Sequence, residues 1–252
     1  MKLKNQTIFI SGASRGIGRA CAIALAKEGA RIGVHYHKNI DAARETLSVL
    51  AGDGHKVFQA DLRQEAEVET MIKQVFSEWE TIDVLVNSAG IYTEHPIEKV
   101  EAREWMTQWK NILSVNVLGM AHLCYHFGRK MMKQHSGRII NIGSRGAFRG
   151  EAESPAYGAS KAAVHALSQS LAKKLGQYGI SVTAVAPGFV ETDMGADVLE
   201  TERGDALRAE SPFGRVAQPD EVAHLVAFLA DTQSGFLSGG IVDINGASYL
   251  RM

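Results

Sequence analysis

A serine, a tyrosine and a lysine within residues 141–161 could together move a proton. Tyr157 and Lys161 are four apart in a run with helical periodicity, so both side chains should project from one helix face. A tyrosine ordinarily has a pKa of about 10, and a fixed ammonium beside it favours the phenolate and lowers that pKa. Ser144 follows the apolar run 138–142, which is typical of a buried parallel strand. Although such a Tyr/Lys pair also arises by chance, the set predicts acid–base chemistry on a carbonyl or an alcohol.

Composition and charge narrow the classes of protein. The 252 residues are 45% hydrophobic and 22% charged, which is ordinary for a soluble globular chain, and the net charge of −1 gives no general attraction to nucleic acid or anionic lipid. No cationic and apolar leader pattern is present, and no apolar run approaches the roughly 20 residues that span a bilayer. The two cysteines form no ligand cluster. We expect a cytoplasmic protein without a structural disulfide or zinc site.

Strand-like and helix-like segments alternate from residue 7 to residue 246. This alternation predicts an α/β fold, a Rossmann-type doubly wound parallel sheet that binds its ligand at the carboxyl ends of the strands. No repeat or linker interrupts the order, so residues 1–252 should form a single domain. The charged stretch around 190–213 is interpreted as a lid over the substrate.

A glycine-rich loop at 11–18 lies between the apolar run 7–10 and the Ala-rich helical stretch 17–30. Strand, glycine loop and helix form a phosphate-binding arrangement, because glycines admit the pyrophosphate and the helix N-terminus offers free N–H groups. An ordinary tight turn is the alternative. The candidate phosphate-binding residues are Gly12, Ser14, Arg15, Gly16, Ile17 and Gly18.

The end of the next strand, 31–36, should meet the adenosine ribose of a dinucleotide. A carboxylate there binds the 2′-hydroxyl of NAD, whereas basic residues accommodate the 2′-phosphate of NADP. Tyr36, His37 and Lys38 occupy this position near Arg15, and no carboxylate opposes a phosphate, so we predict NADP(H) rather than NAD(H). His37 and Lys38 could instead be solvated loop residues. No metal site is predicted, because His35 and His37 lack a third ligand.

Taken together, these motifs resemble the short-chain dehydrogenase/reductase family over nearly the whole chain. The glycine loop matches its TGxxxGxG pattern with Ser11 for threonine, and residues 87–90 resemble its NNAG element with Ser88 for the second asparagine. Residues 114–119 match its asparagine-containing helix segment, and 187–192 resemble its PGxxxT element. The alternation of elements and the resemblance agree on the fold.

The resemblance implies roles for further residues. Asp61, with Leu62, would meet the adenine amino group or cap the following helix, and Asn87 would steady the sheet beside Ala89 and Gly90. Asn116 would kink its helix and hold a water beside Lys161, which would also bind the nicotinamide ribose. The residues expected around the nicotinamide carboxamide are Pro187, Gly188, Val190 and Thr192.

Residues 137–144 and 186–194 are most similar to the 3-oxoacyl-(acyl-carrier-protein) reductases of this family. An acyl thioester is therefore the first candidate substrate, and an acyl carrier protein is a candidate partner. Arg129, Lys130 and Lys173 could attract this acidic protein, or they could simply be solvated surface residues. Reduction of a sugar, steroid, quinone or other small carbonyl remains open. Two other classes of protein also remain open: a non-catalytic NADP(H)-sensing protein and a nucleotide-sugar epimerase or dehydratase.

The resemblance also implies a homotetramer built on the helices around 115–135 and 155–176. Candidate buried positions there are Met131, Met132, Leu167 and Leu171, which could equally face the sheet. The residues expected to line the substrate pocket are Arg145, Phe148, Arg149, Glu151 and Phe189.

Overall fold

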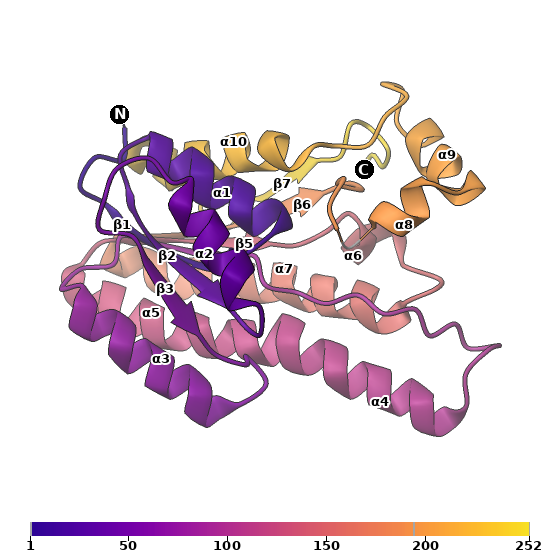
Figure 1. Ribbon diagram of the computed structural model, residues 1–252, viewed down its shortest axis with the longest axis horizontal. Helices are drawn as coiled ribbons and strands as arrows, with labels where there is room; N and C mark the ends of the chain where they lie inside the picture. Colours follow the sequence, from indigo (N-terminus) through magenta and orange to yellow (C-terminus); the bar gives the residue numbers. More distant parts are fainter. Residues whose placement is uncertain (1, 194, 252) are drawn as a thin grey trace.

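The structure is a computed structural model that describes residues 2–193 and 195–251. Within these residues, one sheet of seven parallel strands runs through the molecule in the order β3-β2-β1-β4-β5-β6-β7 (Figure 1). The strands are β1 (Thr7–Ser11), β2 (Arg31–Tyr36), β3 (Lys56–Gln59), β4 (Val84–Asn87), β5 (Gly137–Ile142), β6 (Ile180–Pro187) and β7 (Ile241–Ile244). The predicted α/β fold is confirmed.

Helices cover both faces of this sheet (Figure 1). On one face lie α1 (Gly16–Lys27), α2 (Ile40–Ser48) and α10 (Pro219–Ala230), packed on aliphatic residues of the strands such as Ile8, Ile10 and Val34. On the other lie α3 (Glu65–Glu78), α5 (Met120–Gln134) and α7 (Pro155–Leu175), packed on a core that includes Phe9, Phe58 and Phe127. Strands buried on both faces explain their near-continuous apolar runs.

The strand order reverses at the junction of β1 with β4, where a doubly wound sheet leaves a crevice for its ligand. The register sets Ser11 beside Asn87 and Asn87 beside Asn141, so polar residues align at the carboxyl ends of three central strands. Ser11 Oγ accepts hydrogen bonds from the backbone N–H groups of Ser88 and Ala89, both at 3.2 Å. Ser11 stands where the family pattern has threonine, and its hydroxyl oxygen holds the loop that follows β4.

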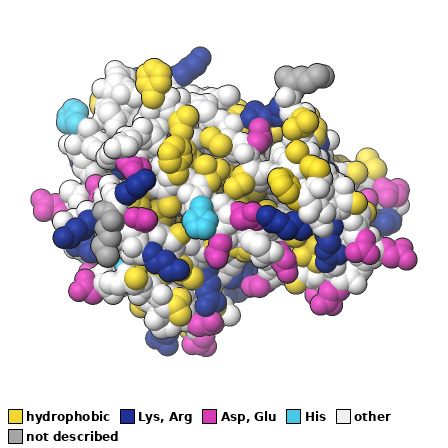
Figure 2. All heavy atoms as spheres, turned by 90° about the horizontal axis from the view of Figure 1, so that it is seen from above, with side chains coloured by type: hydrophobic (Ala, Val, Ile, Leu, Met, Phe, Trp, Pro, Cys, Tyr) yellow, Lys and Arg dark blue, Asp and Glu magenta, His cyan; other side chains and the backbone are white. Residues whose placement is uncertain are grey.

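A long helix below the sheet combines α4 (Ala102–Leu113), a π-helical turn over Ser114–Gly119 and α5. The turn contains Asn116, at the position where a kink is expected. The lid segment contains two short helices, α8 (Ala196–Leu199) and α9 (Glu202–Ala209). Acidic and basic side chains crowd the end of the molecule where these helices lie (Figures 1 and 2).

The side chains considered for a subunit interface mostly take the alternative position, in which they face the sheet. Met131 is fully buried in the core, while Met132 and Leu171 pack against that core from its edge. Positions three or four apart on a helix point toward the sheet, and the periodicity alone does not say whether a given apolar stripe faces the sheet or a partner. The large apolar side chains exposed on this run are instead Leu118 and Tyr125, at 65% and 55%.

Candidate active site

One cavity of about 570 Å³ extends from the glycine loop, past the carboxyl ends of the strands, to the lid. Its wall contains every predicted cofactor and catalytic residue except Asn87 and Asn116, which lie behind it. Residues far apart in the sequence, such as Gly12, Asp61, Tyr157 and Thr192, therefore face a common space. The predicted cofactor and catalytic residues come together around this cavity, whereas Phe148, predicted to line the substrate pocket, is not in its wall and packs against His165.

The glycine loop closely fits the space beneath it. Gly12 has φ +67°, and a Cβ there would lie 2.7 Å from Ala89 Cα, while a Cβ on Gly18 would lie 2.2 Å from Gly12 O. Only glycine suits both positions without a backbone shift. The loop leads into α1, whose first turn carries no acidic residue and receives no side-chain cap. These free N–H groups, together with the glycine cradle, fit the pyrophosphate of a dinucleotide.

His35 on β2 holds this loop in place, a role that the sequence interpretation missed. Its Nδ1 accepts the Gly12 N–H at 3.0 Å, and its Nε2 lies 3.1 Å from the Ala60 carbonyl oxygen. Because a backbone N–H only donates, the ring must be neutral with its proton on Nε2. Burial lowers the pKa of His35 to about 4, which agrees with a neutral ring.

We expect His35 to make the fold sensitive to acid. Its folded-state pKa lies below the ordinary value of 6.5, so the unfolded chain binds more protons as pH falls from 6.5 to about 4, and stability falls with it. The shift corresponds to about 3 kcal/mol of unfolding free energy. His35→Asn keeps an acceptor toward Gly12 but cannot titrate, so denaturant unfolding at pH 7 and pH 4.5 should give a flatter dependence. An unchanged slope would contradict this role.

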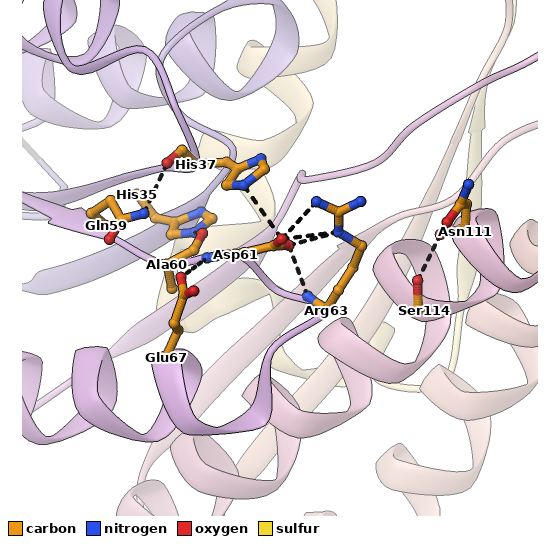
Figure 3. A network of polar contacts seen from close by, with 9 residues as sticks. All are labelled: His35, His37, Gln59, Ala60, Asp61, Arg63, Glu67, Asn111 and Ser114. Carbon is orange, nitrogen blue, oxygen red and sulfur yellow. Dashed lines mark hydrogen bonds and ion pairs between the residues drawn. The ribbon is translucent and has the colours of Figure 1, made fainter.

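The adenosine end of the cavity contains an ion-pair cluster (Figure 3). Arg63 donates to both carboxylate oxygens of Asp61, with Nη2 at 2.6 Å from Oδ2, and His37 Nε2 lies 3.4 Å from the same oxygen. The Arg63 hydrogen bonds are the main cause that lowers the Asp61 pKa. The prediction that no carboxylate lies beside Tyr36, His37 and Lys38 is therefore wrong. Tyr36 pairs with Gln59, so β2 and β3 end together and Asp61, two residues after Gln59, lies beside His37. Arg63, however, balances the charge of Asp61.

Asp61 does not cap α3 in the predicted manner. The N-cap of α3 is Gln64, and Asp61 Oδ1 instead accepts the backbone N–H of Arg63 at 3.0 Å in the preceding turn. Its carbonyl oxygen accepts the Gln64 N–H at 2.9 Å. Asp61 thus shapes the turn before the helix, and its contact with adenine stays a prediction.

Tyr157 and Lys161 project from α7 toward Ser144, which follows β5. Lys161 Nζ lies 5.6 Å from the centre of the Tyr157 ring and donates to the Ile142 carbonyl oxygen at 2.8 Å. Ser144 Oγ accepts the Gly146 N–H at 3.0 Å and also shares a hydrogen bond with Tyr157. The triad predicted from the sequence thus lies around one point of the cavity.

The pKa of Tyr157 shifts opposite to the prediction. Burial raises the pKa of Tyr157 to about 12, and this outweighs the lowering by the Ser144 hydrogen bond. Burial also lowers the pKa of Lys161 to about 8, so the ammonium is itself poorly stabilised. The phenol therefore holds its proton firmly. It suits an acid that donates only to an oxygen on which negative charge is developing.

Asn116 is fully hydrogen-bonded within the protein. Its Oδ1 accepts the Ile91 N–H at 2.8 Å, and its Nδ2 donates to Ile91 O at 3.0 Å and to Ser160 Oγ at 3.1 Å. Asn116 therefore ties the strand-end loop to α7 at Ser160, the residue directly before Lys161. The water beside Lys161 that the resemblance implies stays a prediction. Asn87 likewise donates to Asn141 Oδ1 at 2.8 Å and joins β4 to β5, in agreement with its expected role.

Several residues that the sequence interpretation left out also line the cavity. Tyr92 packs edge-on against Tyr157 with ring centres 5.2 Å apart, and Glu94 pairs with Arg203 of the lid at 2.5 Å. Arg63 could have been found from its spacing, two residues after Asp61 at a strand end. Nothing in the local sequence indicates the contacts of Tyr92 or Arg203.

In the described part of the chain, no three His, Cys, Asp or Glu side chains are grouped to hold a metal, and no helix is long and apolar enough to cross a membrane.

Comparison with known proteins agrees with this site. The model of the family described as enoyl-(acyl carrier protein) reductase matches residues 12–246. The 3-oxoacyl-[acyl-carrier-protein] reductase FabG of Staphylococcus epidermidis is 34% identical over 248 residues, which are 98% of this chain and the whole of that protein. Among solved structures, gox2181 matches with a TM-score of 0.91 at 33% identity, over 98% of this chain and 96% of that one. A gluconate 5-dehydrogenase from Burkholderia cenocepacia, solved with NADP and tartrate, matches with a TM-score of 0.88 at 28% identity, over 98% and 96% of the two chains.

The fold and the site define a doubly wound α/β protein in which a glycine loop, Ser144, Tyr157 and Lys161 share one strand-end cavity. The chain belongs to the short-chain dehydrogenase/reductase family. It is an oxidoreductase that acts on CH–OH and C=O groups, in a family that uses a nicotinamide cofactor.

Proposed function

We propose that the protein reduces a carbonyl to a secondary alcohol with NADPH, and that it catalyses the reverse reaction with NADP⁺. The observation that carries this proposal is that Ser144, Tyr157 and Lys161 share one cavity with the glycine loop. When bound, the nicotinamide supplies or accepts the hydride. The protein residues supply proton transfer and orientation.

In the proposed reduction, the substrate oxygen accepts hydrogen bonds from Ser144 Oγ and from the Tyr157 hydroxyl. Tyr157 donates its proton to that oxygen as negative charge develops there, which suits its raised pKa. The Lys161 ammonium then stabilises the phenolate that remains. Because burial disfavours the charged form, the phenolate then takes up a proton from solvent, which restores the neutral phenol before the next turnover.

The choice of NADP(H) rests on the charges at the adenosine end of the cavity. Arg15, Lys38 and Arg63 contribute three cations to its wall, and Asp61 is already paired with Arg63. A 2′-phosphate would therefore meet an excess of positive charge. NADP in the Burkholderia gluconate 5-dehydrogenase structure is consistent with this choice.

A cofactor comparison tests the choice. We expect kcat/KM to be higher with NADPH than with NADH, and Arg15→Ala and Lys38→Ala each to lower it roughly ten-fold or more with NADPH, because a hydrogen bond to a charged group contributes about 1.5–3 kcal/mol. The same variants should change kcat/KM with NADH much less. Equal losses with both cofactors, or a wild-type preference for NADH, would overturn the choice.

A 3-oxoacyl thioester is the first candidate substrate, supported by the similarity to FabG of Staphylococcus epidermidis. Arg129, Lys130 and Lys173 remain candidates for contact with an acyl carrier protein, but they lie near the distal ends of α5 and α7. Lys173 is twelve residues beyond Lys161, about 18 Å along the helix. A carrier protein docked there would have to reach the site with a long prosthetic group.

A small hydroxy or oxo acid is the second candidate substrate. The wall at the substrate end of the cavity carries Arg145 and Arg149, both paired with Glu210, and the ion pair of Arg203 with Glu94, beside apolar residues such as Leu207. Such a wall favours a polar substrate over an acyl chain, because burying charged groups against hydrocarbon costs free energy. Similarity to an enzyme named gluconate 5-dehydrogenase, solved with tartrate, also supports this candidate.

We also infer a homotetramer that uses the outer faces of the π-helical turn, α5 and α7. Leu118 and Tyr125 are exposed there, and so are the small residues Ala162 and Ala166 of α7. Apolar side chains also gather in the middle of the opposite face, above α1 and α10 (Figure 2). Contiguous exposed apolar surface is typical of subunit interfaces. Sedimentation that shows only a monomer would contradict this inference.

A further inference from the structure

Two arginines lie directly behind the catalytic serine and face the substrate end of the cavity. Arg145 follows Ser144 in the chain, and Arg149 is the last residue of α6 (Gly146–Arg149). The Arg145 side chain is only 4% exposed and that of Arg149 is 28% exposed. Neighbouring Cα atoms are about 3.8 Å apart, so the Arg145 backbone starts within a few ångströms of the group that orients the substrate carbonyl.

Both arginines hold the same carboxylate. Arg149 Nη1 donates to Glu210 Oε1 at 2.9 Å, and Arg145 Nη2 pairs with the other oxygen, Oε2. Two guanidinium groups, one on each oxygen, form a receptor that is well suited to a carboxylate. Glu210 comes from a distant part of the chain, immediately after α9 of the lid.

The charges of the loop show why a carboxylate is needed there. Residues 144–151 carry Arg145, Arg149 and Glu151, and Arg149 Nε lies 3.7 Å from Glu151 Oε1. Without Glu210 the loop would have one positive charge in excess, on a guanidinium that is almost fully buried. An unpaired buried cation is costly, so this position requires an anion.

Glu210 is well placed to be exchanged for another anion. Its side chain is 31% exposed, and it belongs to the lid segment rather than to the sheet or its long helices. Across the cavity the lid has a second ionic contact, between Arg203 and Glu94. The members of these contacts that line the cavity are Arg145, Arg149, Arg203 and Glu94, and a charged ligand in the cavity can compete for their ionic contacts.

We propose that Arg145 and Arg149 form a carboxylate-binding subsite, which Glu210 fills in this structure and the carboxylate of the substrate fills during turnover. The inference rests on the proposed oxidoreductase function and selects the second candidate substrate, a small oxo or hydroxy acid. The carbonyl would bind at Ser144 and Tyr157, with the carboxylate a few bonds away at the arginines. Exchange with Glu210 would couple substrate binding to movement of the lid.

Binding of acids and their neutral amides tests the subsite without requiring turnover. The probes are 3-oxobutanoate, titrated calorimetrically into the protein saturated with NADP⁺, and D-gluconate, titrated into the protein saturated with NADPH, each beside its amide, so that neither acid can react. We expect at least one acid to bind ten-fold or more tightly than its amide. Arg149→Gln should remove most of that ratio, and Arg149→Lys should retain part of it because the charge is kept.

Glu210→Gln provides a test in the opposite direction. Removing the competing carboxylate should tighten the binding of the acid several-fold and leave the binding of the amide nearly unchanged. A role for Glu210 in stability alone would instead weaken both ligands or neither. The substitution keeps an amide oxygen as a hydrogen-bond acceptor toward the arginines, and a denaturant unfolding transition shows whether the variant is folded.

The outcomes separate this inference from the proposed function. Equal binding of acid and amide, including no measurable binding of either, overturns the carboxylate subsite, as does a ratio that Arg149→Gln leaves intact. If the wild type then reduced a 3-oxoacyl thioester and Tyr157→Phe did not, the oxidoreductase function would still hold. The first candidate substrate, the thioester, would replace the small acid. Acid turnover that survives in Tyr157→Phe would instead contradict the proposed mechanism.

Discussion

Tyr157→Phe is expected to lower kcat for carbonyl reduction by roughly a thousand-fold, because the substitution removes the proton donor and general acids typically contribute 10²–10⁴-fold. The ring stays in contact with Tyr92, so the shape of the cavity is kept. Only the hydrogen bond with Ser144 is lost, which costs about 1 kcal/mol of stability. The measurement is NADPH oxidation at saturating substrate, together with NADPH affinity from fluorescence titration, which should change little.

Tyr92→Phe is the matched control for this prediction. It removes the same hydroxyl from a tyrosine of the same cavity, where the hydroxyl makes a weak contact of 3.5 Å with Glu94. Its kcat should stay within a few-fold of the wild-type value. If Tyr157→Phe kept more than about a tenth of the activity, or if both variants lost activity equally, Tyr157 would not be the proton donor.

The fold and the proton-transfer group could be predicted from local sequence patterns. Alternating strands and helices determine the sheet, and a spacing of four on a helix brings Tyr157 and Lys161 to one face. Gly12 and Gly18 could be assigned from the glycine loop between a strand and a helix, and the structure shows that close backbone approach leaves room for glycine alone. In each case a short range rule determines the geometry.

Contacts between distant loops could not be predicted in this way. Glu210 meets Arg145 only because the lid folds back over the cavity, and Arg63 meets His37 through Asp61 because β2 and β3 end together. Periodicity does not encode such pairings. It also does not encode burial, which reverses the expected effect on the Tyr157 pKa. The residues that we propose for substrate choice lie mainly among these distant contacts, whereas Tyr157 and Lys161, which we propose for the chemistry, are brought together locally on α7.

Lys161 should reduce the stability of the fold while it supports catalysis. Burial lowers the pKa of Lys161 from 10.5 to about 8, so the unfolded chain binds more protons between these two values and stability rises with pH across that window. Below pH 8 the full penalty of the buried ammonium, about 3 kcal/mol, is present. Lys161→Met removes the charge but leaves the Ile142 carbonyl without its donor, a loss of about 1 kcal/mol.

We therefore expect Lys161→Met to be about 2 kcal/mol more stable than the wild type at pH 7 and slightly less stable near pH 10.5, with activity lowered at least a hundred-fold. Denaturant unfolding at both pH values and NADPH oxidation provide the measurements. Lys173→Met, the same change at an exposed position of α7, should alter stability by less than about 0.5 kcal/mol at either pH. Lower stability of Lys161→Met at pH 7 would mean that the ammonium is well stabilised within the fold. A stable but inactive variant would instead show that the catalytic charge is maintained at the expense of the fold.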